Sequence, residues 1–324
     1  MIRHLSHVLH TFYDIKPVKI TPQQGGWAAL AFKVQDEKRT YFLKMYEKSR
    51  ASTAKWTALI DTYVPVTVWL MNNSRLQGKL PVPIATNKGT YKCEDEAGVY
   101  LLYSYIEGAT IGEKQLTAEQ AGQLAECVAE LHRYPAANFP LDLSALTENY
   151  EVPFLQPLHD RLEGMWEQEW NEELKNVLRP HRKQLVALID TMLRLSRTLQ
   201  QRHLPLVFCH TDLHNWNLMQ AGGQLILLDW EGLKLAPAEA DMMSFTDKAY
   251  FRTFLAIYRE RHPQYTVDPD VLQFYRGRRK LEDVWEFMEQ LLFDQQTAED
   301  RADSLNHLQR ELSELTEVKG TELP

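Results

Sequence analysis

The residues most able to do chemistry lie in one short stretch, CHTDLHNWNLMQAGGQLILLDWEG, at residues 209–232. It holds two histidines, two aspartates and two asparagines around a Gly-Gly pair and an apolar run. Three interpretations are open: a metal-binding cluster, a phosphoryl-transfer centre, or the polar ends of a hairpin. The spacing of the polar residues distinguishes among them.

The Gly-Gly pair predicts a hairpin turn between the strands NLMQ and QLILLDW. Asn217 and Asp229 lie equally far from Gly223, so a regular hairpin places them opposite each other or nearly so, with Cβ atoms about 4.5–5.5 Å apart. An amide oxygen and a carboxylate at that spacing suit Mg²⁺, which prefers hard oxygen ligands. Asp212 can present a second carboxylate over the same point without binding the metal itself.

The order His210, Asp212, Asn217, hairpin, Asp229 is the arrangement that phosphoryl transfer requires. One carboxylate orients or deprotonates the attacking hydroxyl, while an asparagine and a second aspartate hold the metal on the triphosphate. His210 is expected to be a hydrogen-bonded structural residue. A single Asp or Asn in a loop is more often a turn former, so the prediction rests on the combination. The alternative, a metallohydrolase with His210, Asp212 and His214 as ligands, leaves Asn217 and the hairpin symmetry unexplained.

This pattern resembles the aminoglycoside phosphotransferase family, small-molecule relatives of the protein kinases. His214 fits the family pattern HxDxHxxN, and Trp230 and Glu231 replace the Phe and Gly of a protein kinase's D-F-G. FYRGRRKLEDVWEF (274–287) and DWEGLKLAPAEADM resemble the spectinomycin phosphotransferase branch. The resemblance implies ATP and Mg²⁺ as cofactors, and it implies that Asp241 braces the catalytic loop.

The resemblance also implies an α+β, two-lobed, protein-kinase-like fold. We expect an N-terminal antiparallel β-rich lobe at residues 1–106, which binds the nucleotide. A larger, mainly helical lobe should follow at residues 107–324, with the catalytic loop and the acceptor site.

The hydrophobic pattern agrees with this organisation. In the first lobe it predicts a hairpin of strands 24–34 and 40–46, a helix over 48–63 and a buried strand over 99–106. Thr117 and Gln120 predict a capping box that opens a helix. Further helices are predicted at 154–175, 182–202, 237–261 and 270–294.

The family resemblance places the nucleotide on particular residues of the first lobe. Lys44 lies on the strand where a lysine contacts the α- and β-phosphates. Gly25 and Gly26 form a weak glycine loop, because adjacent glycines let backbone N–H groups approach a phosphate. The backbone groups of Ser104 and Ile106 stand where the hinge between lobes would read the adenine edge.

One feature departs from the family pattern. The helix after Lys44 should carry a glutamate that pairs with the lysine, but ASTAKWTALI contains no acid. Either Glu47, just before the helix, takes that role or Lys44 is held in another way. The departure leaves a nucleotide-binding pseudokinase open as an alternative.

The acceptor site is expected in the helical lobe. Glu282, Asp283 and Glu286 lie in the segment 281–303, which has eight acids and one base, and they could bind a cationic acceptor. A solvated helix face is the alternative interpretation. The acceptor could be an aminoglycoside-type antibiotic or a metabolite such as choline, homoserine or a sugar derivative.

Composition bounds the class of protein. The formal net charge of −8 argues against nucleic acid as a partner, because a basic surface is the usual requirement. The N-terminal residues lack the apolar block of a signal peptide, and no apolar run is long enough to span a bilayer. Three widely spaced cysteines favour reduced thiols. We therefore expect a cytoplasmic protein with no membrane partner; the sequence does not indicate an oligomeric state.

Overall fold

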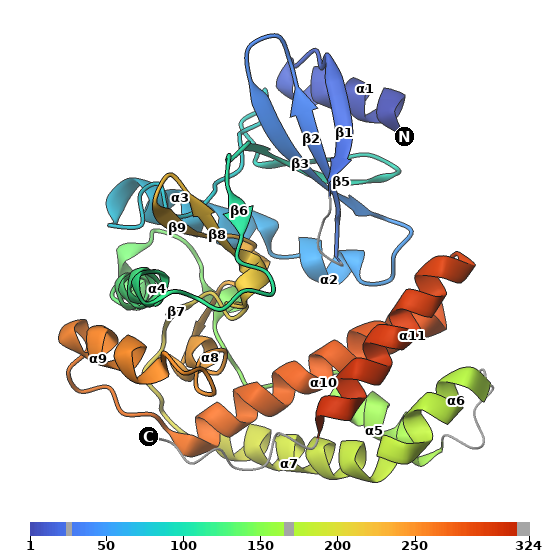
Figure 1. Ribbon diagram of the computed structural model, residues 1–324, viewed down its shortest axis with the longest axis vertical. Coiled ribbons are helices and arrows are strands. Elements are labelled where there is room, and N and C mark those ends of the chain that lie inside the picture. The colour runs from blue at the N-terminus through green and yellow to red at the C-terminus, as the bar shows by residue number, and fades with distance from the viewer. Residues whose placement is uncertain (24–27, 165–171, 316–324) are drawn as a thin grey trace. The chain divides into compact units, whose positions relative to one another are not determined.

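The computed structural model describes residues 1–23, 28–164 and 172–315 (Figure 1). The chain forms two compact units, which are described separately. The first unit comprises Met1–Leu146, Val207–Leu235 and Thr253–Pro263, and the second comprises Thr147–Leu206, Ala236–Arg252 and Gln264–Pro324. The expected lobe boundary after residue 106 falls inside the first unit and stays a prediction.

The first unit begins with a five-stranded antiparallel sheet of order β1-β2-β3-β5-β4. Its strands are β1 (Lys19–Gln23), β2 (Leu30–Gln35), β3 (Thr40–Glu47), β4 (Lys92–Glu94) and β5 (Gly98–Ser104). The predicted hairpin of strands 24–34 and 40–46 is confirmed for its described part, because β2 pairs with β3. Asp36 closes its turn by accepting hydrogen bonds from the backbone N–H groups of Lys38 and Arg39.

Alternation along β3 determines where Lys44 points. Tyr41, Leu43 and Met45 belong to one hydrophobic core on one face of the sheet. Successive side chains of a strand point to opposite faces, so Lys44 and Tyr46 lie on the other face. Lys44 lies on the central strand β3, where it is in register with Ala31 of β2 and Leu101 of β5, so its backbone is away from the sheet edge.

The first core is completed by helix α1 (Ile2–Tyr13), which the sequence analysis did not predict (Figure 1). Its N-terminal residues were interpreted only as lacking a signal peptide. Leu5, Val8 and Leu9 have the i, i+3, i+4 spacing of one helix face, and all three are buried against the sheet.

The segment after β3 forms two helices instead of the single helix predicted over 48–63. Helix α2 (Thr53–Thr57) is one turn long, and α3 (Ile60–Asn73) follows after a break at Leu59. The apolar run 63–71 belongs to α3 and is largely buried. Burial of this run explains why the helix continues well past the predicted end.

The rest of the first unit includes the stretch 209–232. The capping box of Thr117 and Gln120 is confirmed at the start of α4 (Ala118–Leu131). Strands β6 (Ala109–Thr110), β8 (Leu218–Ala221) and β9 (Gln224–Leu227) form a sheet of order β6-β8-β9. Strand β7 (Val207–Cys209) pairs with β10 (Lys234–Ala236). Most of α9 (Phe251–Arg261) also belongs to this unit.

The second unit is helical. Its elements are α5 (Leu155–Glu163), α6 (Glu172–Leu178), α7 (Arg182–Gln200), α8 (Glu239–Met242), α10 (Pro269–Phe293) and α11 (Ala298–Ser313). Helix α10 packs against both α7 and α11 (Figure 1). The helices predicted at 182–202 and 270–294 are confirmed.

Two other predicted helices differ from the structure. The helix predicted at 154–175 ends at Glu163, and α6 begins at Glu172 after residues that lie outside the described part. The helix predicted at 237–261 is two helices, α8 and α9, separated by turns. Apolar periodicity on both sides of a turn is easily taken for one helix.

The α+β fold, with an antiparallel sheet followed by a mainly helical part, is confirmed. Among the described residues, no helix combines the length and the apolar character needed to cross a membrane.

Candidate active site

The hairpin of β8 and β9 turns through Gly222 and Gly223, which both have positive φ, 54° and 81°. Two such residues form the tight turn that glycines permit, and Ala221 pairs with Gln224 across it. The hairpin is therefore confirmed, but its register differs by one residue from the expected one. Asn217 lies opposite Leu228, whose N–H donates to the Asn217 carbonyl at 2.8 Å.

Asp229 lies one residue after Leu228, and its backbone no longer has the extended conformation of a strand. Its backbone has φ 60° and ψ 73°, the left-handed conformation, and it begins a short 3-10 helix at Trp230–Gly232. Aspartate tolerates this conformation better than most residues. The strand alternation that the sequence analysis assumed therefore stops at Leu228, and the backbone turn at Asp229 determines where the carboxylate points.

Asp212 and Asn217 contact each other directly. The Asn217 amide nitrogen donates to the carboxylate and to the backbone carbonyl of Asp212, both at 2.9 Å. Because both partners are acceptors, the amide orientation is fixed by the network. Among the residues that the structure describes, none donates to the Asn217 amide oxygen. Asn217 is buried, so this oxygen is an acceptor without a protein donor among those residues.

His210 joins the loop that carries Asp212 to the end of β9, just before Asp229. It is fully buried, and its Nε2 lies 2.7 Å from the Leu228 carbonyl. Its Nδ1 accepts a long hydrogen bond, 3.4 Å, from the backbone N–H of Asp212. These two contacts assign the proton to Nε2 and occupy both ring nitrogens. The expected structural role of His210 agrees with this geometry and stays a prediction.

A second connection joins the two loops through Thr211 and Gly232. The Thr211 hydroxyl donates to the Gly232 carbonyl at 2.8 Å. A Cβ at residue 232 would lie 2.5 Å from that hydroxyl oxygen and 3.1 Å from the His210 carbonyl. Glycine is therefore required where the two loops approach each other.

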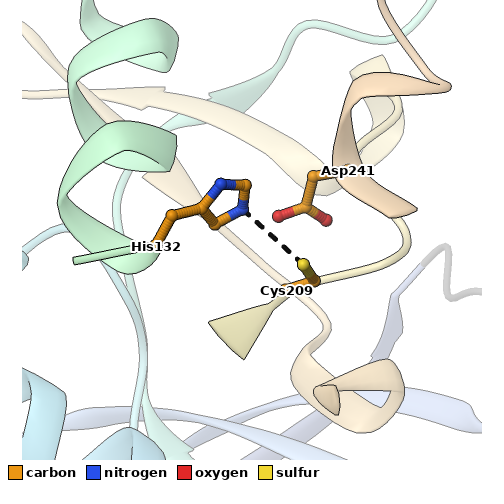
Figure 2. A group of neighbouring side chains, drawn as sticks. All are labelled: His132, Cys209 and Asp241. Atoms are coloured by element: carbon orange, nitrogen blue, oxygen red, sulfur yellow. Dashed lines mark hydrogen bonds between the residues drawn. The ribbon is translucent and has the colours of Figure 1, made fainter. Parts of the chain in front are cut away.

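The first unit also anchors the strand that precedes the catalytic loop. Cys209 Sγ lies 3.7 Å from Nε2 of His132, at the end of α4 (Figure 2). His132 Nδ1 lies 2.8 Å from the hydroxyl of Tyr258 on α9. All three side chains are buried, so they fix the start of the loop in the core.

Lys44 meets two acids of the loop that follows the hairpin. Its ammonium lies 2.7 Å from Oδ1 of Asp229 and 2.5 Å from Oε1 of Glu231. The hydroxyl of Tyr46, two residues further along β3 on the same face, also donates to Glu231. Lys44 thus forms one charged cluster with Asp229 and Glu231, which lie 185 and 187 positions later in the sequence.

Electrostatics keep Lys44 protonated. Burial by itself would lower the pKa of Lys44, but the carboxylates of Asp229 and Glu231 raise that pKa well above the ordinary value. Burial, followed by the nearby Glu231 carboxylate, raises the pKa of the Tyr46 phenol. Lys44 therefore keeps its positive charge, and Tyr46 is a neutral phenol beside it.

Comparisons with known proteins agree with this geometry. The profile of the phosphotransferase enzyme family APH matches residues 19–275, most of the chain. The chain belongs to this phosphotransferase family. No curated protein matches the sequence.

Solved structures of other phosphotransferases share the fold. Spectinomycin phosphotransferase APH(9)-Ia, in complex with ADP and spectinomycin, is 20% identical, with a TM-score of 0.75 over 98% of both chains. Amicoumacin kinase, in complex with AMP-PNP and Ca²⁺, is 15% identical, with a TM-score of 0.63 over 99% of this chain and 95% of that one. Choline kinase LicA from Streptococcus pneumoniae is 16% identical, with a TM-score of 0.59 over 98% of this chain and 98% of that one.

In this family member, Glu231 is the site residue that sequence reasoning missed. It was noted only as a replacement for the glycine of D-F-G. The usable signal was the acid two residues after Asp229, in a sequence whose expected helix after Lys44, ASTAKWTALI, contains no acid. Glu47, the other option, bonds to Arg50 at 3.0 Å, so among the described residues the acids found on Lys44 are Asp229 and Glu231.

The remaining predicted residues are distributed over several places. Gly25 and Gly26 lie outside the described residues. Ser104 ends β5 and Ile106 follows it, so the hinge role stays a prediction. Asp241 is fully buried on α8 in the second unit, where its role as a brace also stays a prediction (Figure 2).

The predicted acceptor residues lie on α10 of the second unit. Glu282 accepts from Arg278 at 2.9 Å, and Asp283 pairs with Arg279 at 3.0 Å. Burial raises the pKa of Asp283 to about 7. Binding of a cationic acceptor by Glu282, Asp283 and Glu286 stays a prediction, and the arginine pairs favour a structural role for the first two.

Proposed function

We propose that this phosphotransferase moves the γ-phosphoryl group of ATP to a hydroxyl of a small molecule. The ion pair between Lys44 and Asp229 carries the proposal, since it joins the phosphate-binding lysine to the metal-binding aspartate of the motif. Phosphoryl transfer needs positioning and charge neutralisation more than covalent chemistry. A lysine, two aspartates and an asparagine held in one compact unit provide those functions.

The donor set fits a hard divalent cation. Asn217 offers an amide oxygen to which no described residue donates, and the Asp229 side chain is 38% exposed, so a ligand can reach it. These two residues would hold Mg²⁺. The metal would neutralise charge on the β- and γ-phosphates. Lys44 adds its own charge for the α- and β-phosphates.

Asp212 is the proposed catalytic base. Its carboxylate is fixed by Asn217 on one oxygen, and Nε2 of His214 lies 3.4 Å from the other. A carboxylate held in this way can orient an acceptor hydroxyl and receive its proton as the phosphoryl group departs from ATP. The Asp212 side chain keeps 28% exposure, so a substrate can reach it.

The acceptor is proposed to be an aminoglycoside-type antibiotic or a related compound. Family membership supports a phosphotransferase, and the fold is shared with enzymes for spectinomycin, amicoumacin and choline. Kinases of choline, homoserine or a sugar derivative remain the alternatives. A cytoplasmic location, where ATP is present, is part of the proposal.

Two other functions have less support. The pseudokinase alternative arose because Lys44 lacked a partner acid, and two acids now contact it. The metallohydrolase alternative needs His210 as a ligand, but both nitrogens of that buried ring face protein groups. The observed contacts thus favour transfer chemistry.

The test is ATP consumption with Mg²⁺ across a panel of hydroxyl compounds. The panel contains spectinomycin, other aminoglycosides, choline, homoserine and sugar derivatives. We expect one class to give ADP and an equal amount of phosphorylated compound, measured by mass spectrometry. ATP binding without turnover on any compound would favour a pseudokinase, and no ATP-dependent thermal shift would contradict the proposal.

A further inference from the structure

The two acids on Lys44 are not equivalent. The Glu231 side chain is 9% exposed, while the Asp229 side chain is 38% exposed. A buried carboxylate that loses its cation pays a larger desolvation penalty than an exposed one. When nucleotide and metal arrive, Asp229 can therefore leave the lysine, and Glu231 is the acid that stays.

Two contacts, one to its side chain and one to the backbone of its short helix, fix the position of Glu231. The hydroxyl of Tyr46 donates to the same carboxylate oxygen that contacts Lys44. Its own backbone lies in the short helix whose Gly232 carbonyl accepts from Thr211. The carboxylate thus has a fixed position relative to both the catalytic loop and strand β3.

The helices that follow Lys44 offer no substitute in their described residues. Asp61 at the start of α3 pairs with Lys92 at 2.7 Å. Helix α3 instead contributes Tyr63, which is buried, and its phenol pKa is raised by burial and then by the nearby Glu231 carboxylate. A tyrosine of α3 therefore lies in the electrostatic neighbourhood of Glu231, while the acid itself comes from the Asp229 loop.

We propose that Glu231, held by Tyr46, is the positioning residue for Lys44. In protein kinases a helix glutamate orients the corresponding lysine; here an acid two residues after the metal-binding aspartate does so. The inference rests on the proposed function, because it assigns how the ATP-binding lysine is oriented. It separates two roles: Glu231 aligns Lys44 for the phosphates, and Asp229 is free to bind the metal.

The test is a double-mutant cycle on nucleotide affinity, which needs no acceptor. Lys44→Met, Glu231→Gln and the double variant are titrated with AMP-PNP in the presence of Mg²⁺ by calorimetry. We expect each single variant to bind about tenfold more weakly, a change of about 1.4 kcal/mol. The double variant should be no weaker than Lys44→Met alone, because Glu231 acts through the lysine.

Direct binding of the metal by Glu231 predicts a different result. The Glu231→Gln effect would then persist in the Lys44→Met background, and higher Mg²⁺ would relieve it. That outcome overturns the inference. Adenosine serves as the folding control, since it lacks phosphates: its affinity should be unchanged in Glu231→Gln, whereas a general structural defect would weaken it as well.

Two further variants keep the test independent of how well Glu231→Gln folds. Tyr46→Phe removes only the hydroxyl that holds Glu231, and it should weaken AMP-PNP binding about threefold without changing adenosine binding. Glu47→Gln is the matched control on the same strand, because Glu47 pairs with Arg50, and it should bind like the wild type. A wild-type protein that fails to bind AMP-PNP contradicts the proposed function; normal binding by Glu231→Gln contradicts only the inference.

Discussion

The charged cluster around Lys44 in the first unit and the arginine–acid pairs within α10 of the second unit are organised differently. In the first unit, Lys44 of β3 pairs with Asp229 and Glu231, which lie 185 and 187 residues later. In the second unit, Arg278 and Arg279 pair with acids only four residues further along α10.

The difference shows which acidic clusters point to function. Pairs at i, i+4 form on most charged helices and stabilise an isolated helix by only about 0.2–0.5 kcal/mol each. A buried pair between distant strands and loops exists only because the fold brings its members together. The acids of α10 were therefore weak evidence for an acceptor site, while the Lys44 cluster supports the proposed phosphate site.

The largest expected effect tests the chemistry of the first unit. Asp212→Ala should lower kcat by about 100- to 10,000-fold, since the proposed general base is lost, while AMP-PNP affinity changes little. The measurement is ATP turnover with the acceptor that the panel identifies. Asp247→Ala, at an exposed aspartate that pairs with Lys248, is the control and should keep full turnover. Unreduced phosphoryl transfer by Asp212→Ala would disprove the base assignment.

The second prediction concerns Arg278, an α10 arginine that also has a distant partner. Arg278 contacts Glu148, whose side chain is fully buried, at 2.9 Å. Arg278→Met should lower the free energy of unfolding by about 3–5 kcal/mol, because it leaves a buried carboxylate without its cation. Urea unfolding measures the change.

Arg310→Met is the matched control for that experiment. Arg310 is 73% exposed and pairs only at 3.5 Å with Glu314, one turn away on the chain. Its loss should change the free energy of unfolding by less than about 0.5 kcal/mol. Equal effects at Arg278 and Arg310 would remove the distinction between local and distant pairs.

The third prediction tests the close approach of the two loops in the first unit. Gly232→Ala forces a Cβ against Thr211, so we expect the free energy of unfolding to fall by about 1–3 kcal/mol and turnover to fall with it. Gly122→Ala in α4 is the control: its Cβ would meet only Ile257, at 3.7 Å. Alanine there should stabilise the helix by up to about 1 kcal/mol.

The smallest effect concerns pH and the second unit. Burial raises the pKa of Asp283 to about 7, while an unfolded aspartate titrates near 3.9. The folded state then binds more protons than the unfolded state between these values, so stability falls as pH rises from about 4 to 7. Asp283→Asn should remove about 1–2 kcal/mol of that fall, measured by urea unfolding at several pH values. An unchanged slope would show that Asp283 is well solvated.

Local signals in the sequence predicted several elements correctly. The capping box of Thr117 and Gln120 and the turn at Gly222 and Gly223 depend on neighbouring residues alone. The register of the hairpin was wrong by one residue because it assumed a turn centred on Gly223. The two-residue turn centres between the glycines, and Asp229 leaves the strand through its positive φ.

The fold contained features that local signals could not give. Helix α1 is amphipathic, but its role became visible only against the sheet that buries Leu5, Val8 and Leu9. The pattern also gave neither the break between α2 and α3 nor the split of 237–261 into α8 and α9. Periodicity reports an apolar face and not where a helix must end.

The sequence by itself determined the chemistry: the residue types and spacing of Asp212, Asn217 and Asp229 already pointed to phosphoryl transfer. It also showed that the helix expected after Lys44 lacks the glutamate that would pair with the lysine. Only the tertiary structure decided which acid meets Lys44, because that contact joins a strand to a loop 187 residues away. Spacing along a chain specifies neighbours within a hairpin or helix, whereas a contact across such a distance depends on the packing of the whole unit.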